Sequence, residues 1–158
     1  MYNNRFKDNN EYRTKINEHR PLSEDALKQI KEYYKIGLTY ASNAIEGNTL
    51  NLAETKVVLE DGITIGGKSL KEHYEAIGHA KAFDKIVELS QNAIFTEEDI
   101  KSLHKLFYNQ IDEVNAGKYR TSQVIITGSD VELPKPEELN AKMAEFVNSL
   151  PHLKETLH

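Results

Sequence analysis

The sequence predicts a mainly α-helical fold with one small β-hairpin. Through most of the chain, apolar side chains recur every three or four residues, which is the spacing of one helix face. Several segments open with a Ser, Thr or Asn followed three residues later by an acidic residue, which is typical of a helix start. Residues 123–133 alone combine a β-branched run with turn residues. Strands do not alternate with helices, so no parallel sheet is expected.

The composition is that of an ordinary globular domain. The 158 residues carry a net charge of −5, which argues against a nucleic-acid surface. No apolar run is long enough to cross a membrane, and no signal-peptide pattern opens the chain. Cysteine is absent, which excludes disulfides, thiolate metal sites and a Cys nucleophile. We therefore expect a cytoplasmic protein with no nucleic-acid or membrane partner, either monomeric or a homo-oligomer.

The N-terminal segment and the long helix after it are separated by a proline. Residues 1–20 are expected to form either an arm or a short helix that carries Tyr12 on its apolar side. Ser23 is a good N-cap for the next helix, predicted over about 23–46. Gly47 is expected to close that helix in the left-handed conformation. Gly37, inside it, suggests close packing of a neighbour.

Three more helices and a hairpin are predicted before a last helix. Asn51, Ser69 and Thr96 are the expected N-caps of the three helices. The β-branched run 123–127, followed by turn residues and then 131–133, predicts the hairpin. The last helix has an apolar stripe that is expected to stop at Pro151. The members of this stripe are Leu139, Met143, Phe146, Val147 and Leu150.

Residues 62–69 match the phosphate-loop pattern of Gly, four residues, Gly-Lys-Ser. That pattern binds phosphate where a strand leads into it, but residues 51–61 read as a helix. We interpret the match as accidental and the segment as an interhelical loop that ends at the N-cap Ser69. No pair of histidines has metal-ligand spacing, so no metal site is predicted.

Several stretches resemble the Fic family. Residues 42–47, Ser-Asn-Ala-Ile-Glu-Gly, are similar to its inhibitory motif of Ser or Thr, three residues, Glu, then Gly or Asn. Residues 61–70 and 116–124 also resemble the family, and the likeness follows nearly the whole chain in order. The resemblance implies that residues 21–158 are the N-terminal part of a Fic-like domain. In it, 23–46 would be the inhibitory helix and 123–133 a flap hairpin.

The resemblance implies a protein adenylyltransferase that uses ATP and Mg²⁺ to modify a Ser, Thr or Tyr hydroxyl of a target protein. In the family, the motif Glu pairs with an Arg of the catalytic segment and blocks productive ATP binding. Autoinhibition is accordingly expected at Ser42, Glu46 and Gly47, while Arg120 is expected to anchor the flap on a carboxylate or on helix-end carbonyls. The flap residues expected to dock the target segment and to contact nucleotide are Val124, Ile125, Ile126 and Thr127.

The catalytic signature of the family, His-Pro-Phe, two residues, Gly-Asn-Gly-Arg, is absent. None of the 6 histidines is followed by Pro-Phe. We therefore expect a domain incomplete at its C-terminus, with no catalytic residue of its own, no tightly bound cofactor and no activity by itself. A separate or following catalytic segment would be its partner. The alternative is a non-catalytic helical binding or regulatory module that docks a peptide on its hairpin edge.

Overall fold

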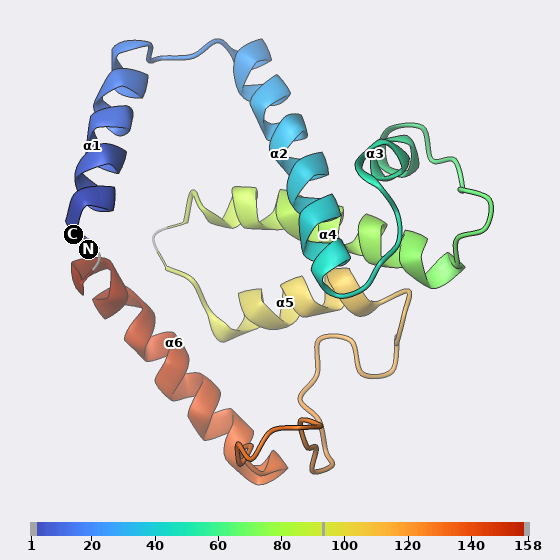
Figure 1. Ribbon diagram of the computed structural model, residues 1–158. Coiled ribbons are helices and arrows are strands. Elements are labelled where there is room, and N and C mark those ends of the chain that lie inside the picture. Colours follow the sequence, from blue (N-terminus) through green and yellow to red (C-terminus); the bar gives the residue numbers. More distant parts are fainter. Residues whose placement is uncertain (1–2, 93, 157–158) are drawn as a thin grey trace. The chain divides into compact units, whose positions relative to one another are not determined.

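The structure is a computed structural model that describes residues 3–92 and 94–156. These residues form helices and loops and contain no strand (Figure 1). They divide into two compact units between Tyr34 and Lys35, inside helix α2, and each unit is described by itself. The helices are α1 (Asn3–Glu18), α2 (Glu24–Ile45), α3 (Leu52–Glu60), α4 (Leu70–Leu89), α5 (Glu97–Tyr108), the short 3₁₀ helix η1 (Pro136–Glu138) and α6 (Leu139–Thr156).

In the first unit, α1 is a regular helix with an exposed apolar side. Tyr12 and Ile16 remain 63% and 52% exposed. Glu11 and Lys15, four residues apart, form an ion pair of 2.8 Å, a pair that supports an isolated helix by only a few tenths of a kcal/mol. The N-terminal segment is therefore helical.

Ser23 accepts a hydrogen bond from the Ala26 N–H at 3.2 Å and caps α2 as predicted.

In the second unit, α3, α4 and α5 all begin with a predicted cap. Asn51, Ser69 and Thr96 each accept the backbone N–H of the residue three positions on, and the acidic side chain at that position returns a bond to the cap. α4 and α5 run side by side in opposite directions, and α3 packs on α4 (Figure 1). The capping boxes thus fix where the helices of the central pair begin.

α4 and α5 approach so closely that one residue must lack a side chain. A Cβ added at Gly78 would lie 2.4 Å from the backbone oxygen of Phe107. Gly37, by contrast, has no described atom within 4 Å of such a Cβ, so the close packing expected there is wrong. The close contact that requires a glycine is on α4, and the helical pattern does not predict it.

The core is small, and polar groups make up much of it. Leu50, Val58 and Ala76 are buried together, with Ile65 and Ile77 packed against them. Buried polar side chains accompany them from the ends and facing sides of the helices. Those with 6% exposure or less are Thr39, Asn43, Thr55 and His73. Hydrogen bonds therefore contribute to holding these helices together, in addition to apolar packing.

A carboxylate junction joins the chain after α2 to the start of α4. One oxygen of Glu72 accepts the Thr49 N–H at 2.8 Å and the Thr49 hydroxyl at 2.5 Å, and the other accepts the Ser69 N–H at 2.7 Å. The hydrogen bond from the Thr49 hydroxyl, followed by the bonds from Ser69, lowers the pKa of Glu72 to about 2. Asn48 adds bonds to the Glu72 carbonyl and to the Glu75 carboxylate.

Residues 123–133 are not the predicted hairpin. The turn is present, because the Ser129 N–H donates to the Ile126 carbonyl at 3.1 Å and Gly128 has φ of 78°. The flanking residues do not pair as strands. The Gln123 side-chain amide instead donates to the Leu133 carbonyl at 3.2 Å. A two-stranded hairpin without a third strand is marginal in water, and here side chains close the loop in place of a ladder.

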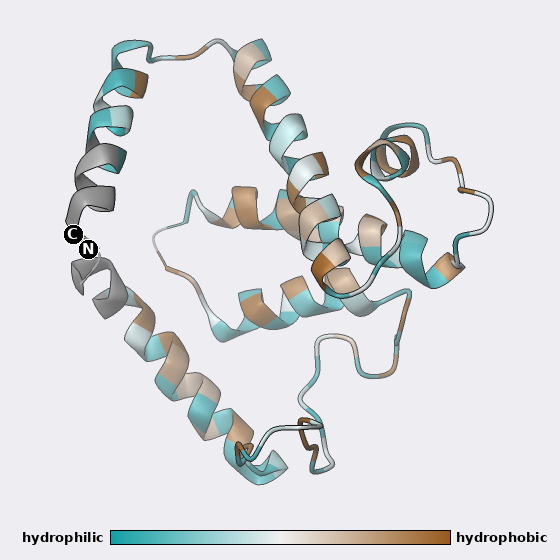
Figure 2. Ribbon diagram, in the orientation of Figure 1, coloured by the Kyte–Doolittle hydropathy of each residue, from teal (hydrophilic) through white to brown (hydrophobic). Residues whose placement is uncertain are grey.

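The last helix, α6, continues past Pro151 to Thr156, so the predicted stop is wrong. Hydrophobic positions recur along this helix (Figure 2). A proline inside a helix removes one backbone hydrogen bond but does not always end the helix.

In the part of the chain that the structure describes, no helix is both long and apolar enough to cross a bilayer.

Replacing Gly78 by Ala should destabilise the second unit by about 1–3 kcal/mol, because the new methyl group would force the backbones of α4 and α5 apart. Urea unfolding followed by circular dichroism gives the free energy of unfolding. Gly37→Ala is the matched control, since open space surrounds its Cβ and it should stabilise the helix by up to about 1 kcal/mol. Equal effects of the two substitutions would contradict the close approach.

Acid should weaken the Glu72 junction. Its folded-state pKa of about 2 lies below the ordinary 4.5, so its stabilisation is complete above pH 4.5 and is lost as the pH falls toward 2. Glu72→Gln should therefore be less stable than wild type at pH 7, and the gap should narrow at pH 3. Urea midpoints at both pH values measure this. A gap that stays constant between the two would show that the charge of Glu72 does not matter.

Candidate functional site

The end of α2 is a helix stop of the type that the sequence predicts. Gly47 has φ of 90°, its N–H donates to the Ala44 carbonyl at 3.1 Å, and the Asn48 N–H donates to the Asn43 carbonyl at 3.0 Å. This pair of bonds is the Schellman motif, with Gly47 as the first residue beyond the helix. Glu46 is consequently the C-cap, one residue after the last helical turn ends at Ile45.

Glu46 projects into solvent at this helix end. Its side chain is exposed, and in residues 3–92 and 94–156 its carboxylate has no hydrogen bond or ion pair. The neighbouring Ile45 is 83% exposed. A negative charge near a helix C-terminus faces the negative end of the helix dipole, which costs a few tenths of a kcal/mol up to about 1 kcal/mol. The described chain therefore offers this carboxylate to a cation without supplying one.

The last turns of α2 are seated on α4 by polar contacts. Thr39 is fully buried, and its hydroxyl lies 2.9 Å from Nδ1 of His79. Burial lowers the pKa of His79, so the imidazole is neutral at physiological pH. One turn later, Asn43 is 6% exposed, and its Nδ2 has no partner among the described residues. Ser42, the first residue of the motif, is half-buried beside it.

The predicted docking residues Val124, Ile125, Ile126 and Thr127 lie together in the loop between α5 and η1. Val124, Ile125 and Ile126 are 41%, 84% and 52% exposed. Within the described residues, no hydrogen bond or ion pair joins them to the turn that carries Glu46. The structure thus presents two separate candidate sites, a carboxylate at the end of α2 and an apolar loop after α5.

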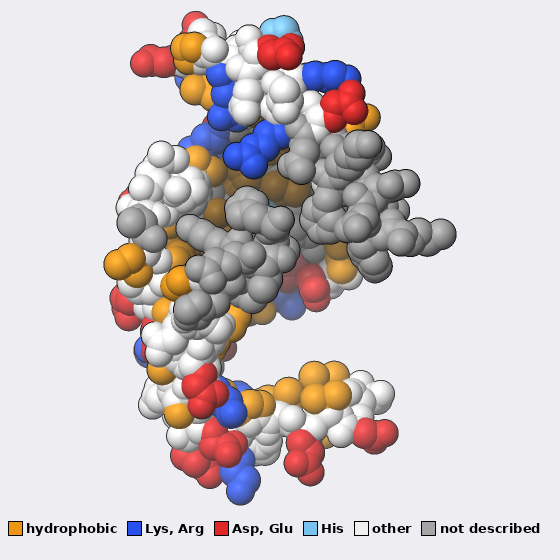
Figure 3. Space-filling view, turned by 90° about the vertical axis from the view of Figure 1, so that its left-hand side faces the viewer, with side chains coloured by type: hydrophobic (Ala, Val, Ile, Leu, Met, Phe, Trp, Pro, Cys, Tyr) orange, Lys and Arg blue, Asp and Glu red, His pale blue; other side chains and the backbone are white. Residues whose placement is uncertain are grey.

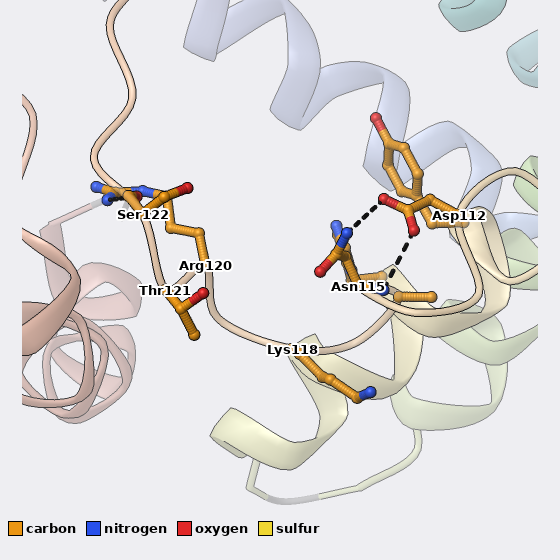
Figure 4. Close-up of a pocket in the computed structure, with 9 residues that line it drawn as sticks. Asp112, Asn115, Lys118, Arg120, Thr121 and Ser122 are labelled. Carbon is orange, nitrogen blue, oxygen red and sulfur yellow. Dashed lines mark hydrogen bonds between the residues drawn. The ribbon is translucent and has the colours of Figure 1, made fainter.

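Arg120 anchors that loop as expected, but on loop carbonyls. Its guanidinium donates to the Ser122 carbonyl at 3.0 Å and to the Pro134 carbonyl. It therefore joins the two ends of the segment 123–133, as Figure 4 shows for the Ser122 side. Sequence reasoning allowed a carboxylate or helix-end carbonyls and did not foresee this pairing, because residues 122 and 134 approach each other only in the folded loop.

A pocket of about 290 Å³ lies between α5 and Arg120 (Figure 4). Nδ1 of His104 accepts the Gly117 N–H at 2.7 Å, and the His104 ring stacks on Tyr108 with centroids 4.7 Å apart. Lys118 donates to the Val114 carbonyl at 2.7 Å. Because these polar groups already bind the protein's own backbone, the pocket supports the loop and does not offer free cations to a ligand.

The segment 62–69 is an interhelical loop, and no strand leads into it. His73, on α4, holds it, because its Nε2 accepts the Ile65 N–H at 2.9 Å and its Nδ1 bonds to the Ser69 carbonyl at 2.7 Å. The Lys68 ammonium donates to the Thr49 carbonyl at 2.6 Å and lies 3.7 Å from a Glu54 carboxylate oxygen. A phosphate-binding lysine would be directed at a ligand, whereas this one is bonded within the fold.

The described residues hold no group of three His, Asp or Glu side chains that could bind a metal ion.

The Glu72 junction was not predicted from the sequence, although the cap at Ser69 that Glu72 completes was. The signal available was Glu at the third position after Ser69, which indicates a capping box. The second set of bonds, to Thr49, bridges 23 positions of sequence and had no local signal.

No model of a protein family matches the chain, but individual relatives do. A protein adenylyltransferase Fic of Nematostella vectensis is 35% identical over 121 residues, which are 75% of this chain and 28% of that protein. One of Aedes aegypti is 34% identical over 123 residues, 77% of this chain and 24% of that protein. The chain thus spans about a quarter of the length of these curated relatives.

Solved structures show the same likeness. Fic-1 from C. elegans superposes with a TM-score of 0.75 at 28% identity, covering 91% of this chain and 42% of that one. A Fic domain containing signaling protein from Bacteroides thetaiotaomicron gives 0.78 at 28% identity, covering 93% of this chain and 57% of that one. The motif at the end of α2, the helical fold and both comparisons agree, and this chain belongs to the Fic family.

Proposed function

We propose that this chain is the regulatory and target-docking part of an autoinhibited Fic protein. The intact protein would transfer AMP from ATP to a Ser, Thr or Tyr hydroxyl of a target protein. Relatives named protein adenylyltransferase Fic support the reaction class. In the proposal, Glu46 is the brake and the segment 123–133 holds the target.

The observation that carries the brake is the unpaired carboxylate of Glu46 at the C-cap of α2. An arginine of the catalytic segment can bind this carboxylate through its planar fork of N–H donors, which suits a bidentate pair. The same arginine is the natural partner of a nucleotide phosphate. Two anions cannot occupy that position together without strong repulsion, so Glu46 excludes productive ATP. Gly47 contributes by ending α2 so that Glu46 reaches out, and Ser42 is the half-buried residue one turn earlier.

The chemistry of transfer requires groups that this sequence does not contain. A histidine of the family's His-Pro-Phe signature would take the hydroxyl proton, and an arginine with backbone N–H groups would offset charge on the phosphates. The described residues do not form a Mg²⁺ site, so we assign no step through a metal to them. Their contribution is to hold the brake, and to hold the target segment beside Val124–Thr127, where the nucleotide would also be contacted.

A non-catalytic module that docks a peptide is the second candidate. The exposed apolar loop favours it, because Ile125 is 84% exposed and such a surface is unusual without a partner. The two functions differ in what the chain does with nucleotide. A docking module needs none, while the regulatory part acts only where ATP is bound by a catalytic segment.

Replacing Glu46 by Gly in a version of the protein that carries the His-Pro-Phe segment should raise AMP transfer by roughly 5–150-fold, the range expected for a coupling of about 1–3 kcal/mol. Transfer of label from α-labelled ATP to protein measures it. Glu60→Gly is the matched control, because Glu60 is also an exposed carboxylate at a helix C-terminus and should leave the rate unchanged. An unaltered or lower rate for Glu46→Gly would reject the brake.

The 158-residue chain by itself should bind ATP with Mg²⁺ only weakly, and Lys68→Ala should not change that affinity, because the Lys68 ammonium is already bonded to Thr49 and close to Glu54. Calorimetric titration of both proteins tests this. Tight binding by the wild-type chain would mean that its nucleotide site is complete. Tight binding that is lost in Lys68→Ala would instead revive the phosphate-loop interpretation.

A further inference from the structure

A groove lies in the loop after α5. Its volume is about 600 Å³, and we call it the 123–137 groove after the residues that line it. The apolar part of the lining is Val124, Ile125, Val131, Leu133 and Pro136. Val131 is 64% exposed and Ile125 is 84% exposed, so this apolar surface faces solvent in the described chain.

Unpaired backbone groups run along one side of the groove. Among the hydrogen bonds of the described chain, none uses the backbone N–H or carbonyl of Val124 or Ile125. The two ends of the loop are joined by side chains, with Arg120 bonded to Ser122 and Pro134. The backbone of Val124 and Ile125 therefore has no hydrogen-bond partner within the described residues and is free to pair with another chain.

The charges around the groove are mostly negative. Three carboxylates line it, from Asp130, Glu132 and Glu137, against the single cation of Lys135. In the described residues none of the three carboxylates forms an ion pair or a hydrogen bond. In the lowest part of Figure 3, which by its height is this loop and the start of α6, hydrophobic side chains lie exposed beside acidic ones. The groove thus combines an apolar floor with an uncompensated negative charge.

We propose that the 123–137 groove binds an extended target segment rich in both apolar and basic side chains, which adds as a strand along Val124 and Ile125. Apolar side chains of the segment would cover Ile125 and Val131, and its Lys or Arg side chains would meet Asp130 and Glu132. Main-chain bonds give a strand-adding peptide its affinity, and complementary charge selects among peptides. The inference rests on the proposed docking role and adds the chemistry of the target.

The test uses two labelled peptides of about ten residues. Both contain the same alternating valines and a single threonine. In the first peptide the residues between the valines are lysines, and in the second they are glutamates. Fluorescence anisotropy with the 158-residue chain measures both affinities. The lysine peptide should bind at least about tenfold tighter, and its advantage should shrink at high salt because exposed charges are screened. A lysine peptide methylated on alternate backbone nitrogens should lose binding, since it cannot pair as a strand.

Charge reversal in the protein gives the second arm. Asp130→Lys with Glu132→Lys should abolish or invert the preference for the lysine peptide. Glu60→Lys with Asp61→Lys is the control, because it changes the net charge equally and places cations at the exposed C-terminus of α3, where the dipole favours them. Circular dichroism confirms that both variants are folded.

The outcomes separate the inference from the proposed function. Equal binding of the two peptides, or an unchanged preference after reversal at 130 and 132, overturns the basic target segment and leaves docking at the loop intact. Binding of neither peptide overturns the inference and the docking half of the proposed function together. The brake at Glu46 is unaffected by either result, since the AMP-transfer assay tests it independently.

Discussion

The carboxylate of Glu72 is the interaction on which the turn after α2 depends. One of its oxygens receives two bonds from Thr49 and the other completes the cap of α4 at Ser69. One anion therefore fixes both the start of α4 and the path of the chain that leaves α2. Charge-assisted hydrogen bonds are directional as well as strong, so they hold this turn in one orientation. This junction lies directly after the helix stop at Gly47 that makes Glu46 the C-cap of α2.

Polar contacts matter here because the apolar core of the second unit is modest. Several of its buried apolar residues are alanines, which bring little surface out of water. The helices compensate by approaching closely at Gly78 and by hydrogen bonds at buried positions such as Thr39 and His73. Asn43 is an exception, because its buried Nδ2 lacks a described partner, and an unmade bond of this kind costs about 1–3 kcal/mol.

The sequence could predict structure wherever the cause is local. Helix caps at Asn51 and Thr96 and the left-handed Gly47 depend on residues three or four positions away, and all are present. The prediction of a hairpin was wrong because strand pairing depends on what lies beside each strand. Here Arg120 closes the loop instead. Likewise, only the crossing of α4 over α5 decides that Gly78, and not Gly37, needs to be a glycine. For the candidate sites, the motif residues could be predicted from the sequence, but the groups that hold them could not.

The two candidate sites stand on separate supports, and this constrains how a brake could act. The turn with Glu46 is held from α4 through Glu72, whereas the docking loop is held at its ends by Arg120. In the part of the chain that the structure describes, no hydrogen bond connects these supports. A brake that worked by reshaping the docking loop would have to act through the packing of α4 on α5, because a conformational signal requires contacts that differ between two states. In the proposed function, competition for one arginine needs no such route, since the charge of Glu46 would act directly at the position a phosphate would take.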